Sequence, residues 1–131
     1  MGTSPASCSL RECAQADWYN NSENPQSLLG ALFEYVEISE SCSAEGQQPL
    51  TIRVCLLASD RSGRIELTYT GVRQYSFQAF SGKRGTSGVH GVVLGEELHP
   101  TKSDWVRHKV MLVGGEWNIE ADEAHYHWNA I

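Results

Sequence analysis

Long apolar runs and the motifs of common chemistries are both absent from this sequence. No stretch approaches the roughly 20 apolar residues of a helix that crosses a membrane, so no membrane span is expected. The cysteines have no CxxC spacing, and the patterns GxxxxGK[ST], GxSxG and HExxH do not occur. The sequence therefore predicts no enzyme, no catalytic residue and no cofactor.

Basic residues are scarce relative to acidic ones. The chain carries 10 Lys and Arg against 16 Asp and Glu, for a formal net charge of −6. Nucleic-acid binding is not expected, because that affinity comes largely from Lys and Arg side chains that neutralise phosphates. A basic protein partner would be attracted if the acidic residues cluster. The first residues also lack the basic start and apolar core of a secretory signal, which favours the cytoplasm.

Length and cysteine content indicate one ordinary domain. With 131 residues, we expect a single β-rich domain over residues 1–131, in which residues 1–8 are flexible. The four cysteines would permit two disulfides, but a domain of this size does not need them and nothing indicates export. We therefore expect free thiols, with Cys55 buried in a strand as a small apolar side chain.

Residues 64–80 show the clearest pattern in the chain. Ile65, Leu67 and Tyr69 alternate with polar residues, which is typical of a strand with one buried face. Gly71 interrupts the alternation, and a glycine at such a point usually marks a bulge or a close approach of the backbone. We expect this segment to be central to the core, either as one bent strand or as two strands that share a corner.

The other predicted elements are one helix and several short strands. Ser9 and Glu12 fit a capping box, which predicts a helix over residues 9–20. Trp18 and Tyr19 would anchor that helix on a sheet. Strands are expected over residues 32–39, 50–58, 92–94, 105–113 and 116–128, turns at 59–63 and 114–115, and loops over 81–91 and 96–104. The predicted fold is mainly β, either a curled antiparallel sheet or a small β-sandwich, with one short N-terminal helix.

The last predicted strand, residues 116–128, changes its apolar face midway. Trp117 and Ile119 occupy odd positions, whereas Tyr126 occupies an even one. A slip of one residue exchanges the two faces of a strand. We therefore expect a bulge or a break at residues 122–123.

A pair of histidines and one cysteine are candidate chemical sites. His125 and His127 would share a strand face near several carboxylates, and such pairs can bind zinc. Solvent-facing histidines opposite the apolar Tyr126 explain the spacing as well, and no metal signature accompanies it. Cys42 lies in an acidic loop that disfavours the reactive thiolate. We predict neither a metal site nor a nucleophile.

Acidic residues recur in the first and last predicted strands. They are Glu34, Glu37, Glu40, Glu116, Glu120, Asp122 and Glu123. Charge runs usually mark a solvated face, and the alternative is a docking surface for a basic protein. On that alternative, the predicted partner-binding residues are Glu116, Trp117, Glu120, Asp122, Glu123 and Tyr126. The two aromatic residues would serve as anchors only if exposed, because alternating strand residues otherwise face the core.

Three segments carry a resemblance to a known group of proteins. They are Asp17-Trp18-Tyr19, the strand pair LTIRVCLL and IELTYTGVRQYSF, and the closing EWNIEADEAHYHW, which together span residues 17–128. In this layout the chain resembles small β-rich bacterial immunity proteins of polymorphic toxin systems. The resemblance implies a non-enzymatic protein that binds a cognate toxin, often a nuclease, and blocks its active site.

A different class of function fits the same composition. A curled sheet opens where its strands diverge, and a small molecule could bind there. The alternative to toxin inhibition is therefore a small-molecule-binding β domain of unknown ligand. An exposed edge strand could also pair with a second copy, so the oligomeric state stays open.

Overall fold

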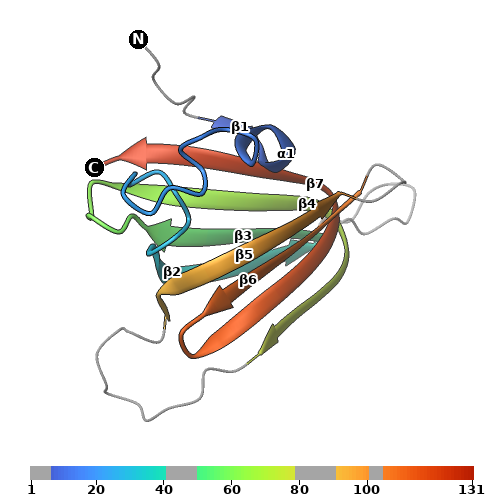
Figure 1. Ribbon diagram of the computed structural model, residues 1–131. Helices are drawn as coiled ribbons and strands as arrows, with labels where there is room; N and C mark the ends of the chain where they lie inside the picture. The colour runs from blue at the N-terminus through green and yellow to red at the C-terminus, as the bar shows by residue number, and fades with distance from the viewer. Residues whose placement is uncertain (1–6, 41–49, 79–90, 101–104) are drawn as a thin grey trace.

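The computed structural model describes residues 7–40, 50–78, 91–100 and 105–131. Within these residues the chain forms one antiparallel sheet of seven strands that does not close on itself, with one short helix, as the sequence predicts (Figure 1). The elements are β1 (Ser7–Ser9), α1 (Leu10–Cys13), β2 (Leu32–Glu40), β3 (Leu50–Leu57), β4 (Gly63–Gln78), β5 (Val93–Pro100), β6 (Val106–Leu112) and β7 (Gly115–Ala130). The strand order is β2-β3-β4-β7-β6-β5, and β1 pairs with β7.

The long strands β4 and β7 form the middle of the sheet. Each has 16 residues, and they pair with each other along their whole length. The first half of β4 also pairs with β3, and the first half of β7 pairs with β6. This confirms the central position predicted for residues 64–80, of which residues 79 and 80 lie outside the described part.

Both long strands are bent at the same level, beside Gly71. Gly71 has a positive φ of 62°, and the pairing of β4 with β7 shifts register between Val72 and Gln74. On β7, Asp122 and Glu123 are both exposed, so the buried face changes there as the sequence predicts. β4 is therefore one strand with a bulge, and the bend curls the sheet around its apolar face.

Replacing Gly71 with alanine is expected to lower the free energy of unfolding by about 1–3 kcal/mol, since positive φ disfavours residues with a side chain. An added Cβ would also lie 2.9 Å from the Cβ of Asp122. The control is Gly95→Ala, whose Cβ would lie 3.4 Å from the flexible Met111 methyl group. Urea denaturation should show the loss in the first variant alone. Equal midpoints would mean that the bulge does not require glycine.

The core lies inside this curl and is completed by the N-terminal segment. Large side chains of the four middle strands are fully buried, among them Ile52, Ile65, Leu67, Tyr69, Ile119 and Tyr126. Leu10, Tyr19 and Leu28, from the segment between β1 and β2, join the same cluster. The apolar face of the sheet is therefore covered at one end by this segment (Figure 1).

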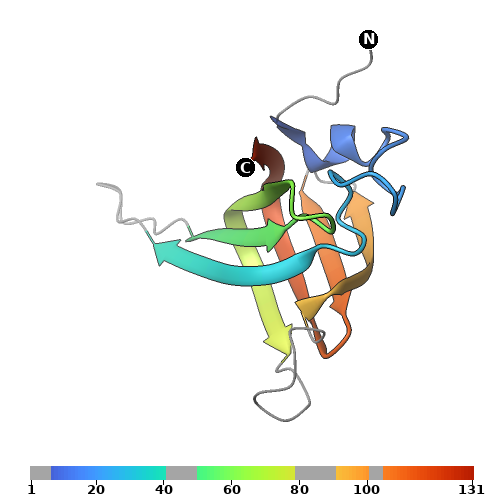
Figure 2. The ribbon, with the colours of Figure 1, turned by 90° about the vertical axis from the view of Figure 1, so that its left-hand side faces the viewer.

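The two outer strands of the sheet meet at one end only. The start of β5 approaches the start of β2 through an isolated bridge between Leu32 and Val92. The Val93 amide donates to the Ala31 carbonyl at 2.9 Å, and the Gly30 amide donates to the Val93 carbonyl at 3.0 Å. Beyond this contact β2 crosses the molecule away from β5 (Figure 2). The curl is therefore open on one side.

The predicted helix over residues 9–20 is wrong in length. Ser9 is the N-cap, and its Oγ accepts from the Glu12 amide at 3.3 Å, but the helix ends at Cys13. Tight turns follow, in which amides bond to carbonyls three residues earlier. These turns bring the neighbouring Trp18 and Tyr19 to the core together. A continuous helix would separate them by roughly 100°.

Two predictions about the second half of the chain are also corrected. Residues 96–100, predicted as a loop, belong to β5. The alternation expected of a strand is hard to recognise here because Glu96 points inward and because the register of β5 with β6 shifts between Val93 and Gly95. The turn between β6 and β7 is formed by Val113 and Gly114, one position earlier than predicted, since Gly115 already pairs with Leu112. Residues 81–90 and 101–104 lie outside the described part.

The expectation of free thiols throughout is wrong. Cys8 and Cys13 form a disulfide, with their Cα atoms 6.0 Å apart. Domain size indicated that no disulfide was needed, but β1 and α1 follow each other directly and bring the two residues within bonding reach. Ser7 and Cys8, expected to be flexible, lie in β1. Cys55 is free and buried as predicted, and Cys42 lies outside the described residues.

Candidate functional site

Two of the six predicted partner-binding residues are core residues. Trp117 and Tyr126 are fully buried, so the condition of exposure for an anchor is not met. Tyr126 Oη donates to the Gln26 carbonyl at 2.6 Å, and Trp117 Nε1 donates to Tyr69 Oη at 3.4 Å. Tyr126 thus joins the N-terminal segment to the sheet and Trp117 packs within the core, which is the alternative that the sequence left open.

The four predicted acidic residues lie on the outer face of β7, and basic groups accompany three of them. Glu116 lies 3.4 Å from Lys109 Nζ, and Asp122 pairs with Arg73 at 2.8 Å. Glu123 lies 3.2 Å from His125 Nε2. Much of the charge on this face is compensated locally, which favours a solvated, ion-paired surface over a strongly acidic one.

The histidine pair shows no arrangement for metal binding. His125 and His127 are both exposed on the outer face of β7, and their Nε2 atoms contact Glu123 and Asn129 respectively. Among the described residues, no three His, Cys, Asp or Glu side chains are grouped closely enough to hold a metal ion.

The described part of the chain also has no helix long and apolar enough to cross a bilayer.

The edge strand β2 presents exposed apolar and acidic side chains together. Tyr35 is 53% exposed and Ile38 is 45% exposed, although both are large and apolar. The Glu37 side chain is 62% exposed, and Glu40 is exposed at the end of the strand. Along residues 34–40, β2 pairs with β3 on one side, and no other described strand pairs with its second side.

Charge on β2 is partly compensated by arginines of β3 and β4. Arg53, on the neighbouring β3, bonds to Glu66 through Nε and Nη2 at 2.9 and 2.7 Å, and only Nη1 reaches Glu37, at 3.5 Å. These contacts with Glu66 raise the pKa of Arg53. Glu34, by contrast, is fully engaged by Arg64 at 2.9 Å. Within the described part of the chain, Glu37 is therefore ion-paired only through this longer contact, and most of its side chain is exposed to solvent.

Cys55 lies behind this edge strand as a buried thiol. Its thiol is buried next to Glu34, with Sγ 3.7 Å from Oε1. Burial raises the pKa of Cys55, which keeps the thiol protonated at neutral pH.

An apolar pocket of about 250 Å³ opens beside the inner face of β2. We call it the aromatic pocket; it is lined by Phe33, Val36, Phe77, Gln78, Leu112, Glu116 and Trp117. The Trp117 ring centroid lies 5.8 Å from that of Phe33 and 6.3 Å from that of Phe77, so three rings surround the space. The pocket lies on the open side of the curl, where β2 diverges from the rest of the sheet.

The floor of the aromatic pocket connects to a buried chain of polar groups. Below Trp117, Tyr69 Oη lies 2.7 Å from His108 Nδ1, and His108 Nε2 lies 2.7 Å from Glu96 Oε2. Burial raises the pKa of Tyr69, so its hydroxyl is protonated and donates to Nδ1. His108 then donates from Nε2 to the Glu96 carboxylate. The chain is satisfied internally and supports the floor rather than facing a ligand.

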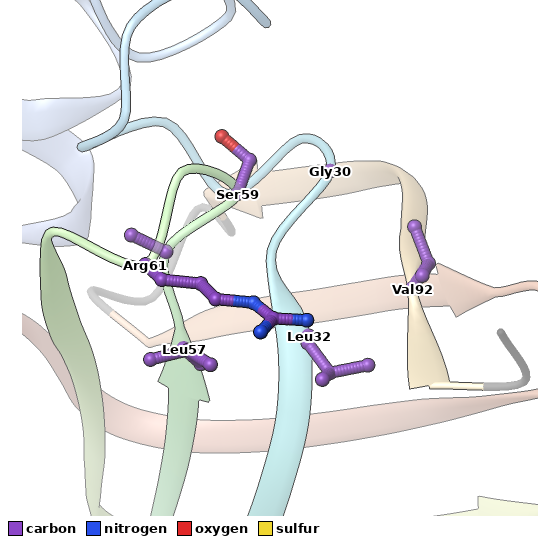
Figure 3. A pocket seen from close by; sticks show the side chains of 7 residues that line it. Gly30, Leu32, Leu57, Ser59, Arg61 and Val92 are labelled. Carbon is purple, nitrogen blue, oxygen red and sulfur yellow. The ribbon is translucent and has the colours of Figure 1, made fainter. Parts of the chain in front are cut away.

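A second pocket, of about 330 Å³, lies where β2 and β5 meet. Its walls include Leu32, Leu57 and Val92, and the Arg61 guanidinium extends across it while the Ser59 side chain points away (Figure 3). Arg61 stands in a turn with a positive φ of 63°. A lining of one exposed guanidinium over apolar walls offers few polar groups that could fix the orientation of a ligand.

Comparison with known proteins adds no assignment: neither the family models, nor the curated proteins, nor the solved structures gave a match to this chain. The sequence had indicated the acids of β2 but not the exposure of Tyr35 and Ile38, nor the pocket beside them. An alternating strand reads the same in the middle of a sheet and at its edge. Only the strand order places β2 outside.

Proposed function

We propose that the protein is a non-enzymatic binding protein that captures a basic protein partner along β2. The observation that carries the proposal is this edge strand, on which Tyr35 and Ile38 are exposed next to Glu37 and Glu40. The resemblance to immunity proteins supports a toxin domain as the partner. Inhibition would follow from covering the toxin's active site.

The physical basis is the combination of an unpaired strand edge and exposed acidic side chains. The second side of an edge strand carries amide and carbonyl groups that a partner strand can bond. The net charge of −6 would steer a basic partner toward the protein, and the exposed Tyr35 would supply contact area. Charge would chiefly speed association, whereas packing would slow dissociation.

The test is co-expression with the toxin domain encoded in the neighbouring reading frame, together with a binding assay on the purified pair. Glu37→Lys/Glu40→Lys is expected to weaken binding about tenfold or more and to abolish protection. The matched control, Glu120→Lys/Glu123→Lys, changes the net charge equally on the outer face of β7. It is expected to keep both binding and protection.

Two results would count against this proposal. If the β7 variant loses protection while the β2 variant keeps it, the surface predicted from the sequence is the binding site instead. If the wild-type protein neither binds the toxin at low salt nor protects the cell, the immunity function is wrong.

The aromatic pocket favours a second function, a β domain that binds a small apolar molecule. Its volume and lining suit a ligand with one or two rings. Such a ligand would raise the thermal midpoint without any protein partner, because it binds the folded state alone. A thermal-shift screen of small aromatic compounds therefore separates the two functions.

Location in the cytoplasm is part of the immunity proposal, because an intracellular toxin would act there. There the Cys8–Cys13 disulfide of the structure would be reduced, since disulfides persist chiefly in oxidising compartments. We expect both residues to be modified when the cells are lysed directly into denaturant that contains an alkylating reagent and no reductant, as read by mass spectrometry. A pair that stays unmodified until a reductant is added would place the protein in an oxidising compartment instead.

A further inference from the structure

We infer that the aromatic pocket receives one large apolar side chain from a partner segment that adds to β2 as an extra strand. The inference rests on the proposed function and deepens it by naming the mode of recognition. It assigns β2 the role of template and the pocket the role of specificity site.

Side chains alternate between the two faces of β2, and those on the inner face include two that line the pocket. Phe33 and Val36 line the pocket, and Ile38 is the next residue whose register places it on the same inner face. In a strand that pairs with β2, every second side chain would also point inward. One of these side chains would lie directly over the pocket, because two of its walls belong to β2 itself.

The size and chemistry of the pocket suit a single side chain. A cavity of about 150 Å³ lined by apolar side chains holds a benzene molecule, so about 250 Å³ accommodates a Phe, Leu or Met side chain. The rings of Phe33, Phe77 and Trp117 lie at tilted angles to one another, the geometry in which aromatic side chains favour contact with a further ring. An acidic side chain would lose its hydration there and face the Glu116 carboxylate on the pocket wall.

The acidic residues along β2 define what should flank that side chain. Glu37 points to the outer face of β2, and Glu40 ends the strand. Lys or Arg residues beside the apolar residue would meet these carboxylates as the strand adds. The expected recognition segment is therefore extended and basic, with one large apolar residue on its inner face.

The test selects random peptides, each as long as β2, from a phage-displayed library on the whole protein. We expect the selected sequences to share one large apolar residue with Lys or Arg at alternate positions. Replacing that apolar residue with alanine should weaken binding, measured by fluorescence anisotropy, about tenfold or more. Methylating the backbone nitrogens of the same peptide should abolish binding, because a paired strand donates from its amides.

Variants of the protein locate the bound side chain. Val36→Trp fills the pocket from β2 and is expected to remove the difference between the apolar peptide and its alanine version. Ile131→Trp introduces the same ring beyond the opposite end of β7 and should leave that difference unchanged. If Val36→Trp does not fold, as judged by circular dichroism, Phe77→Ala removes one wall and is expected to reduce the difference in the same way.

The outcomes separate this inference from the proposed function. No selected peptide, or a peptide that binds wild-type protein and Val36→Trp equally, overturns the inference and leaves the co-expression result standing. Indole that binds in the pocket while no peptide does assigns the site to a free small molecule and also overturns it. Peptides that bind as expected beside a toxin that stays lethal uphold the pocket and reject the toxin as partner.

Discussion

Replacing His108 with leucine is expected to lower the free energy of unfolding by about 3–5 kcal/mol, because it breaks a buried polar pair from one side. The His108 side chain is fully buried and the Glu96 side chain is only 7% exposed. Without the imidazole, the Glu96 carboxylate would remain in the core and lose the donor that His108 Nε2 supplies. Tyr69 would at the same time lose the acceptor for its hydroxyl proton. Urea denaturation measures the loss.

The double variant Glu96→Leu/His108→Leu is the control for this interpretation. Removing both partners leaves no unpaired carboxylate, and similar apolar replacements of buried pairs are often neutral or stabilising. We therefore expect the double variant to be more stable than His108→Leu alone. If the loss of stability in the double variant equals the sum of the losses in Glu96→Leu and His108→Leu, the two side chains do not couple. The contribution of His108 is then one of packing only.

Replacing Leu67 with alanine is expected to cost about 2–5 kcal/mol. Leu67 is fully buried in the first half of β4, between Val54 of β3 and Tyr126 of β7. The middle strands on either side restrict any collapse into the space that the side chain leaves. Chemical denaturation followed by tryptophan fluorescence gives the free energy of unfolding.

Leu94→Ala provides a control with the same chemical change. Leu94 is 63% exposed, so its truncation removes little buried surface and is expected to change stability by less than about 0.5 kcal/mol. Equal effects of the two substitutions would mean that Leu67 does not lie in the core.

The sequence predicted the elements whose pattern is local. The alternation of apolar and polar residues around Leu67 predicted that β4 is a central strand. The predicted change of buried face at residues 122–123 appears as the exposed pair of Asp122 and Glu123 opposite Gly71. These features are readable because they depend on successive residues of one strand. The mainly β fold follows from them.

Features that depend on distant partners could not be predicted in this way. Glu96 has the polarity of a loop residue, and only His108 on the neighbouring strand explains why it points inward. The helix over residues 9–20 is cut short because Tyr19 is needed in the core, which its local sequence does not reveal. The candidate site could not be predicted from the sequence for a related reason. The exposure of Tyr35 and Ile38 follows from the place of β2 at the edge of the sheet.

The central position of β7 has a consequence for how the protein is made. β7 follows β1, β4 and β6 in the chain, and it pairs with all three. During translation these strands emerge without the neighbour that joins them, and pairings between distant segments form slowly. Unpaired strand edges are exposed to association with other chains in that interval. Slowing synthesis before β7 has left the ribosome should therefore increase aggregation of the nascent protein.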